Sequence, residues 1–186
     1  MLNFAQMFAL FILRHADADT KAPTDAERFL SEKGMDQARK IGRFLRDQGI
    51  QFDQILTSPL VRARQTGDLV AGELGRSDLV AYVDFLAIGM NPATVLKRLS
   101  QYAPVPKESG STKVTPDKLS DKLASRPAHS FLLVGHEPDL GEFIAYLIGS
   151  GQDTIHLKKA GLAKVTLPKW KAGVGTLEFL LIEKYL

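Results

Sequence analysis

The sequence predicts an α/β protein of three layers, in which a mostly parallel sheet carries helices on both faces. Short apolar segments of strand length alternate along most of the chain with longer segments whose apolar residues recur at helical spacing. Turn sequences that contain Pro or Gly separate them. Such alternation is typical of parallel sheets. Because 186 residues suffice for one such core, we predict a single domain over residues 1–186.

The first strand is expected over residues 8–13, where an apolar run stops at Arg14 and His15. An uninterrupted apolar run of this length is typical of a strand that is covered on both faces. A polar loop follows it. Ser31 is then placed to cap a helix with apolar residues at helical spacing, and Gly49 is placed to end that helix.

A short second strand is expected over residues 54–57. The dipeptide Ser58-Pro59 that follows it is a strong helix start, because a capping hydroxyl precedes a proline at the first helical position. We expect this helix to run to about Leu74. A third strand is expected over residues 79–85.

The cap-plus-proline signal recurs at Asn91-Pro92 and predicts another helix. Residues 103–127 are rich in Pro, Ser, Lys and Asp, and we expect a mobile insertion there. A buried strand over 131–134 leads into a turn and an amphipathic helix over 140–147. Two last strands are expected over residues 163–167 and 177–182.

The composition excludes several kinds of site. Because the chain has no cysteine, it has no disulfide, thiol nucleophile, iron–sulfur cluster or cysteine zinc site. The net charge of +3 is too small to indicate a nucleic-acid partner. The apolar N-terminal run lacks the charged start of a signal peptide, and no apolar run approaches the roughly 18 residues of a membrane span. We therefore expect a cytoplasmic protein that binds neither nucleic acid nor membrane.

Three of the predicted strands end in polar residues. The first ends in Arg14 and His15, the second ends in Ser58 with Arg62 one turn into the helix, and a later one ends just before His136. Ligand sites in open α/β sheets lie beyond the carboxyl ends of the strands, so these side chains should converge. Arginine binds a phosphoryl group in a bidentate fork, a helix N-terminus adds N–H donors, and neutral imidazole can attack phosphorus. The set therefore indicates a phosphate site.

The motifs at these strand ends resemble those of the histidine phosphatase superfamily, which has the phosphoglycerate-mutase-like fold. They are LRHADA, SPLVRARQT and VGHEPDL, in this order. Further features resemble its SixA-like branch of small phosphohistidine phosphatases: the short chain, Ala16 where the superfamily usually has Gly, and the segments RFLSEKG and LKKAGLA.

The resemblance implies a role for each residue at the strand ends. His15 would be the nucleophile that becomes phosphorylated, Arg14 and Arg62 would bind the phosphate, and His136 would donate a hydrogen bond to the phosphoryl oxygens. Since preorganised positive charge supplies most of the catalysis of phosphoryl transfer, no metal or other cofactor is required. The implied function is a metal-independent phosphatase that removes phosphate from protein phosphohistidine. Its partner would be a phosphorylated protein or a small phosphorylated substrate.

The sequence does not assign a general acid. Many superfamily members carry a glutamate after the third strand, and the acid nearest to that place is Asp84, which is out of register by about a residue. Asp17 and Asp19 are alternatives, because they closely follow His15.

Three other interpretations stay open at this point. The first is a small-molecule phosphomonoesterase or mutase of the same superfamily. The second is a metal-dependent phosphohydrolase in which His15, Asp17, Asp19 and His136 hold a divalent ion, although two nearby arginines would repel that ion. The third is a module that only binds phosphorylated ligands, although all the residues needed for catalysis are present.

Overall fold

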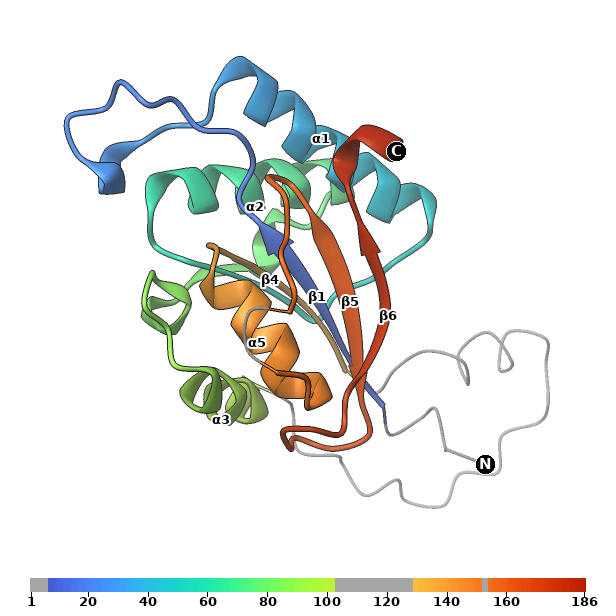
Figure 1. Cartoon of the computed structure of the whole chain (residues 1–186). Helices are drawn as coiled ribbons and strands as arrows, with labels where there is room; N and C mark the ends of the chain where they lie inside the picture. The colour runs from blue at the N-terminus through green and yellow to red at the C-terminus, as the bar shows by residue number, and fades with distance from the viewer. Residues whose placement is uncertain (1–6, 103–128, 152–153) are drawn as a thin grey trace, which may run out of the picture.

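The computed structural model describes residues 7–102, 129–151 and 154–186. Its strands are β1 (Phe8–Arg14), β2 (Gln54–Thr57), β3 (Val80–Tyr82), β4 (His129–Gly135), β5 (Leu162–Leu167) and β6 (Thr176–Leu181). They form one sheet in the order β3-β2-β4-β1-β5-β6 (Figure 1). The first four strands in this order, β3, β2, β4 and β1, are parallel to one another. Strand β5 is antiparallel to both of its neighbours, β1 and β6.

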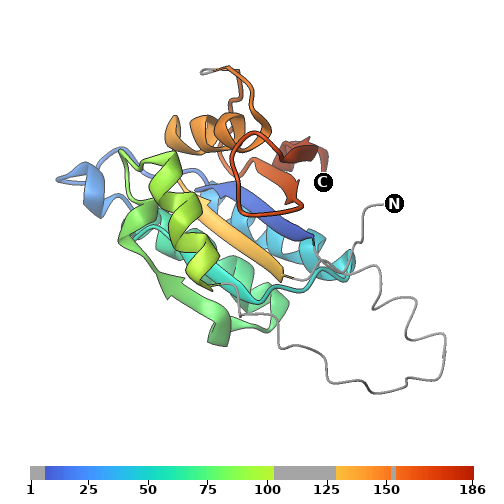
Figure 2. The same ribbon diagram turned by 90° about the horizontal axis from the view of Figure 1, so that it is seen from below.

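Helices cover both faces of this sheet (Figures 1 and 2). They are α1 (Glu32–Asp47), α2 (Val61–Leu74), α3 (Pro92–Tyr102) and α5 (Asp139–Ile148). Successive side chains of a strand point to opposite faces. In β1, Phe11 and Leu13 pack with α1 and α2, whereas Leu10 and Ile12 pack with α3 and α5. The predicted three-layer α/β/α architecture is confirmed.

The start of α1 is held against the loop that follows β1. Ser31 caps the helix as predicted, because its Oγ accepts a hydrogen bond from the amide of Gly34 at 3.1 Å. A side chain at Gly34 would meet the carbonyl oxygen of Asp17 at 1.9 Å, so only glycine allows this close approach. The loop directly after His15 is therefore anchored to α1.

Two of the predicted elements differ from the structure. The helix expected to start at Ser58-Pro59 begins at Val61 and has no side-chain cap. The Ser58 hydroxyl lies instead against the ring of His136, in the turn after β4. The third strand is shorter than 79–85, since the chain turns into a 3-10 helix at Asp84–Leu86 that buries Leu86. The insertion expected over 103–127 lies outside the described residues. None of the described helices is long and apolar enough to cross a bilayer.

Candidate active site

Three neighbouring parallel strands bring the predicted residues to one edge of the sheet. β4 lies between β1 and β2, and Arg14 at the end of β1 is in register with Gly135 at the end of β4. The backbone continues this pairing beyond the strands, because the amide of His15 donates to the carbonyl of Gly135 at 3.0 Å. Likewise the amide of Ser58 donates to the carbonyl of Val134 at 2.9 Å. The side chains that follow the three strands are thus fixed side by side, as the sequence predicts.

His15 is buried and its tautomer is set by its contacts. Its Nδ1 lies 2.8 Å from the carbonyl oxygen of Ala16, which can only accept, so Nδ1 carries the proton. Nε2 then has a lone pair, and it accepts a hydrogen bond from Nε of Arg62 at 3.2 Å. The Ala16 amide is held by Thr66 Oγ1, which in turn donates to the carbonyl of Arg62. These contacts present Nε2 of His15 as a nucleophilic atom beside a guanidinium.

The surroundings of His15 keep its ring neutral. The pKa of His15 is lowered to about 4, chiefly by burial, and the positive charges of Arg62, Arg14 and Arg28 also lower it, against the Ala16 hydrogen bond, which raises it. A protonated imidazole has no lone pair to attack phosphorus, whereas the neutral ring does. At neutral pH the ring is therefore in the form that nucleophilic attack needs.

We expect the ring of His15 to stay neutral until the pH falls well below the pKa of an ordinary imidazole, which is about 6.5. Because the folded-state pKa is lowered to about 4, protonation should begin only below about pH 5. Long-range ¹H–¹⁵N NMR spectra recorded from pH 8 to pH 4 would follow both ring nitrogens and identify the Nδ1-protonated tautomer. A midpoint near 6.5, or a ring protonated at Nε2 at pH 7, would contradict this prediction.

His136 faces His15 from the turn after β4. The two ring centroids are 5.2 Å apart, and Nε2 of His136 lies 2.8 Å from the hydroxyl of Ser58. Burial lowers the pKa of His136 to about 3, with His15 and Arg62 adding to the effect. If the Ser58 hydroxyl donates to Nε2, the ring carries its proton on Nδ1, which has no hydrogen-bond partner among the described residues. His136 thus has a buried donor that is available for a ligand.

Arg14 is linked to Glu137 through the backbone of a single residue, Leu157. Nη1 of Arg14 donates to the carbonyl of Leu157 at 2.8 Å, and the amide of Leu157 donates to Oε1 of Glu137 at 2.9 Å. Burial raises the pKa of the Glu137 carboxyl. Nε of Arg14 is buried and has no partner among the described residues. A buried donor without a partner is costly, so the Nε of Arg14, and Nδ1 of His136 in the tautomer described above, would each be stabilised by an acceptor such as a phosphoryl oxygen.

The acids considered from the sequence do not approach the two histidines. Asp17 accepts hydrogen bonds from Lys159 and from Ser31, and these bonds hold the pKa of its carboxyl below the usual value. Asp84 is exposed and lines a hollow of about 410 Å³ over α3. Among the described residues no hydrogen bond or ion pair joins any carboxyl group to either histidine. Asp17 is thus bound by Lys159 and Ser31, and Asp84 lies in a hollow over α3, so a proton-donor role for either one stays a prediction.

The structure does not assemble the ligand set of the metal-dependent alternative either. Within residues 7–102, 129–151 and 154–186, no group of three or more His, Asp or Glu side chains is arranged to hold an ion. Asp17 turns to Lys159, and the backbone amide of Lys21 donates to the carboxyl of Asp19. The ligand set His15, Asp17, Asp19 and His136 is therefore not formed.

The sequence analysis missed three residues of the site. Asp25 forms an ion pair with Arg62, and Arg28 binds the same carboxylate. Both belong to the polar loop after β1, where no periodicity or motif indicates which side chain turns inward. Thr66 could have been found, because it follows Arg62 by four residues and so lies on the same face of α2.

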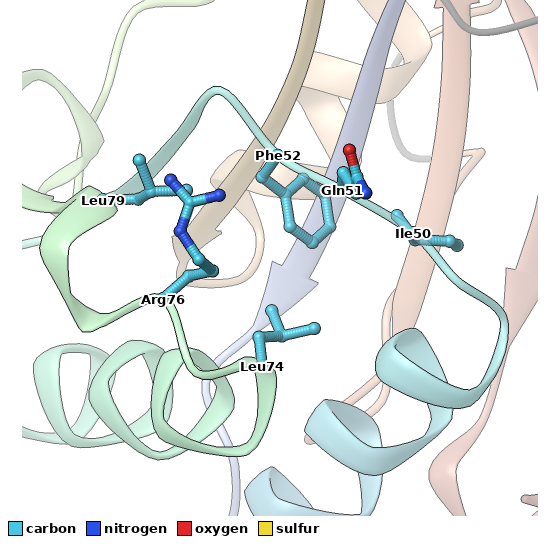
Figure 3. Close-up of a pocket in the computed structure, with 6 residues that line it drawn as sticks. All are labelled: Ile50, Gln51, Phe52, Leu74, Arg76 and Leu79. Atoms are coloured by element: carbon cyan, nitrogen blue, oxygen red, sulfur yellow. The ribbon is translucent and has the colours of Figure 1, made fainter. Parts of the chain in front are cut away.

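A separate cavity of about 220 Å³ lies at the opposite edge of the sheet (Figure 3). It is formed where the chain enters β2 and β3, at the ends of α1 and α2. Its lining residues are Ile50, Gln51, Phe52, Leu74, Arg76 and Leu79. None of them belongs to the histidine and arginine cluster, and Arg76 pairs with the exposed Asp78. This cavity is therefore separate from the site around His15 and His136.

Known proteins are similar in sequence to this chain over most of its length. An uncharacterized protein of Picosynechococcus sp. is 34% identical over 158 residues, which cover 82% of this chain and 81% of that protein. Residues 10–85 match the model of the histidine phosphatase superfamily (branch 1). The chain belongs to the histidine phosphatase superfamily.

This histidine phosphatase is also similar to the phosphohistidine phosphatase SixA of Escherichia coli. The two are 28% identical over 167 residues, which cover 90% of this chain and 89% of SixA. The fold agrees with the solved structure of the protein histidine phosphatase SixA complexed with tungstate. That comparison has a TM-score of 0.74 at 24% identity and covers 95% of this chain and 98% of that one.

Proposed function

We propose that this histidine phosphatase removes phosphate from protein phosphohistidine through a phosphorylated His15, without a metal ion. As substrate binds, Nε of Arg62 exchanges its hydrogen bond to Nε2 of His15 for one to a phosphoryl oxygen. The freed lone pair of Nε2 attacks phosphorus and forms an N–P bond while the bond from phosphorus to the substrate imidazole breaks. The leaving nitrogen takes the bonding electrons and a proton from solvent. Water then attacks phosphorus, the bond to His15 breaks, and a proton passes to solvent as inorganic phosphate is released.

The contacts of the site support a role for each residue in these steps. The Nδ1 hydrogen bond to the Ala16 carbonyl stabilises the positive charge that grows on the ring of His15 as the N–P bond forms. Arg14, Arg62 and His136 supply donors for the charge that spreads over the equatorial oxygens of the transition state. Both proposed steps use the same donors, because phosphorus stays between His15 and the arginines.

The observation that carries the choice of substrate is that no carboxyl group among the described residues contacts either histidine. A phosphomonoester expels an alkoxide, whose conjugate acid has a pKa of roughly 15, close to that of water. Such a leaving group needs a positioned proton donor, worth about 10² to 10⁴ in rate. Phosphohistidine expels imidazole, whose conjugate acid has a pKa of about 6.5, so solvent can protonate it near neutral pH. A site with phosphate-binding residues and no contacting acid therefore favours the N–P bond.

Space beside the site also supports a substrate larger than phosphate. A hollow of about 510 Å³ lies between the loop after β1 and the start of α2, and it includes Val61, the chain neighbour of Arg62. Pro23 and the exposed ring of Phe29 line it as well. This hollow can hold part of a protein surface around its phosphohistidine.

A panel of three substrates tests the proposal. We expect efficient hydrolysis of a phosphohistidine protein, modest hydrolysis of p-nitrophenyl phosphate and poor hydrolysis of sugar phosphates, with all rates unchanged by EDTA. The Asp84→Asn variant should hydrolyse phosphohistidine as the parent protein does. Initial rates of phosphate release at equal enzyme concentration check the ranking.

Two results would contradict the proposal. Sugar phosphates as the best substrates, with their turnover lost in Asp84→Asn or Glu137→Gln, would identify a general acid and an ordinary phosphomonoesterase. Loss of all activity in EDTA, restored by one divalent ion, would favour a metal-dependent hydrolase.

A further inference from the structure

The guanidinium of Arg62 is held at both ends. At one end Nε donates to Nε2 of His15 at 3.2 Å. At the other end Nη2 donates to the carboxylate Oδ2 of Asp25 at 2.8 Å, and Nη1 donates to the backbone carbonyl of the same residue. Arg62 is 3% exposed, so this is a buried cation whose far end is bound by one residue of the loop after β1.

Asp25 is itself braced within its loop. Its second carboxylate oxygen forms an ion pair with Nη1 of Arg28 at 3.0 Å. Arg28 in turn donates to the backbone carbonyls of Asp19 at 2.7 Å and Ala18 at 3.3 Å. The two arginines hold the pKa of the Asp25 carboxyl below its usual value, with Arg28 the larger cause. The carboxylate is thus a fixed and ionised anchor at neutral pH, although the side chain of Asp25 is 57% exposed.

The geometry shows whether Asp25 holds Arg62 in place or instead occupies the position of the substrate phosphate. In the second case it would lie between Arg62 and His15, but Nε of Arg62 contacts the ring of His15 directly. Asp25 binds the two terminal nitrogens instead. A guanidinium has five N–H donors, of which Asp25 binds two and His15 binds the one on Nε. Two donors are left for phosphoryl oxygens, and Nε joins them when Nε2 of His15 bonds to phosphorus.

We propose that Asp25 is a positioning residue, which holds the fork of Arg62 in the plane that directs its Nε edge at the phosphoryl group on His15. This inference rests on the proposed function in that it takes His15 to be the attacked site. Without the carboxylate, Nη2 loses its partner and only the backbone carbonyl of residue 25 still binds Nη1. The guanidinium plane can then swing about the side-chain torsions, and the fork is less preorganised for the transition state. Arg62 should then bind phosphate less tightly and stabilise the transition state less well.

A double-mutant cycle tests whether Asp25 acts through Arg62. We expect Asp25→Ala to lower kcat/KM for p-nitrophenyl phosphate about 10- to 100-fold, with both a lower kcat and a higher KM. Asp25→Asn keeps an acceptor at the same place and should recover part of this loss. In the Arg62→Ala background the Asp25→Ala change should have little further effect, since the group it positions is gone.

Glu27→Ala is the matched control. Glu27 lies in the same 3-10 turn as Asp25, and its carboxylate accepts a hydrogen bond from Thr24 and none from Arg62. This variant should keep the parent kcat and KM. Melting temperatures of all variants separate a loss of stability from a loss of positioning.

Binding of inorganic phosphate, measured by calorimetry, gives a second readout that does not depend on turnover. Asp25→Ala should weaken phosphate binding in the parent protein and leave it unchanged in the Arg62→Ala background. Tighter phosphate binding in Asp25→Ala would show that Asp25 competes with the ligand and would overturn the inference. Equal losses with and without Arg62, or no loss at all, would overturn it as well. Failure to hydrolyse phosphohistidine would instead contradict the proposed function, while the phosphate cycle would still report on Asp25.

Discussion

Replacing His15 by alanine should abolish both turnover and the covalent intermediate. The substitution removes the only ring nitrogen that faces Arg62, and water cannot take over attack at the same position with the same charge arrangement. We expect kcat to fall on the order of 10⁶-fold, the scale on which an enzyme loses rate with its nucleophile. Rapid quench with a ³²P-labelled substrate should trap an acid-labile, base-stable phosphoprotein in the parent protein and none in His15→Ala.

The matched control for this experiment is His129→Ala. His129 opens β4, so it lies at the opposite edge of the sheet from the site, where its ring stacks on Phe8 at 5.7 Å. This variant should still form the phosphoprotein. Normal labelling of His15→Ala would falsify the assignment of the nucleophile and place the phosphate on another residue.

Arg62→Ala should be far more damaging than Arg64→Ala, although the two arginines are separated by one residue. Arg62 is buried in the first turn of α2 and contacts His15, whereas Arg64 is exposed and its guanidinium lies 4.4 Å from the ring centroid of Tyr82. Losing a charge-assisted contact to the transition state costs about 3 kcal/mol, or roughly a hundredfold in rate. Arg64→Ala removes only a surface contact and should change kcat/KM less than about twofold.

Steady-state kinetics with p-nitrophenyl phosphate compare the two variants directly. Arg62→Lys is a useful third protein, because a lysine keeps the charge and loses the planar fork that binds Asp25 and His15 together. It should resemble Arg62→Ala more than the parent. Similar losses in Arg62→Ala and Arg64→Ala would mean that the effect is one of helix stability and not of the site.

The sequence by itself determined the order of the elements and the edge at which the chemistry lies. Apolar periodicity and helix caps are local signals, since each depends on residues within a few positions of one another. The capping serine at Ser31 and the helix at Asn91-Pro92 were predicted for this reason, and both are confirmed. Parallel strands place their carboxyl ends together, so three strand-end motifs sufficed to predict that His15, His136 and Arg62 converge.

Local signals misled where a side chain had a stronger partner elsewhere in the fold. Ser58 has the sequence context of a helix cap, yet its hydroxyl lies beside the buried ring of His136, 78 residues further along the chain. Asp17 follows the nucleophile closely enough to suggest an acid, but Lys159 binds its carboxylate across 142 residues. A buried polar atom requires a hydrogen-bond partner, and no rule of sequence spacing indicates which distant residue provides it.

Only the tertiary structure decided the state of the site. The neutral ring of His15 and the position of its proton depend on burial, on the Ala16 carbonyl and on Arg62, which come together only in the folded chain. The path of an irregular loop likewise decided that Asp25 binds Arg62 across 37 residues. The sequence determined which residues meet because the ends of strands and the periodicity of helices depend on neighbouring residues, and parallel strands share their carboxyl edge. Their tautomer, ionisation and orientation are set by desolvation and by contacts between distant segments, which exist only once the sheet and its loops have packed.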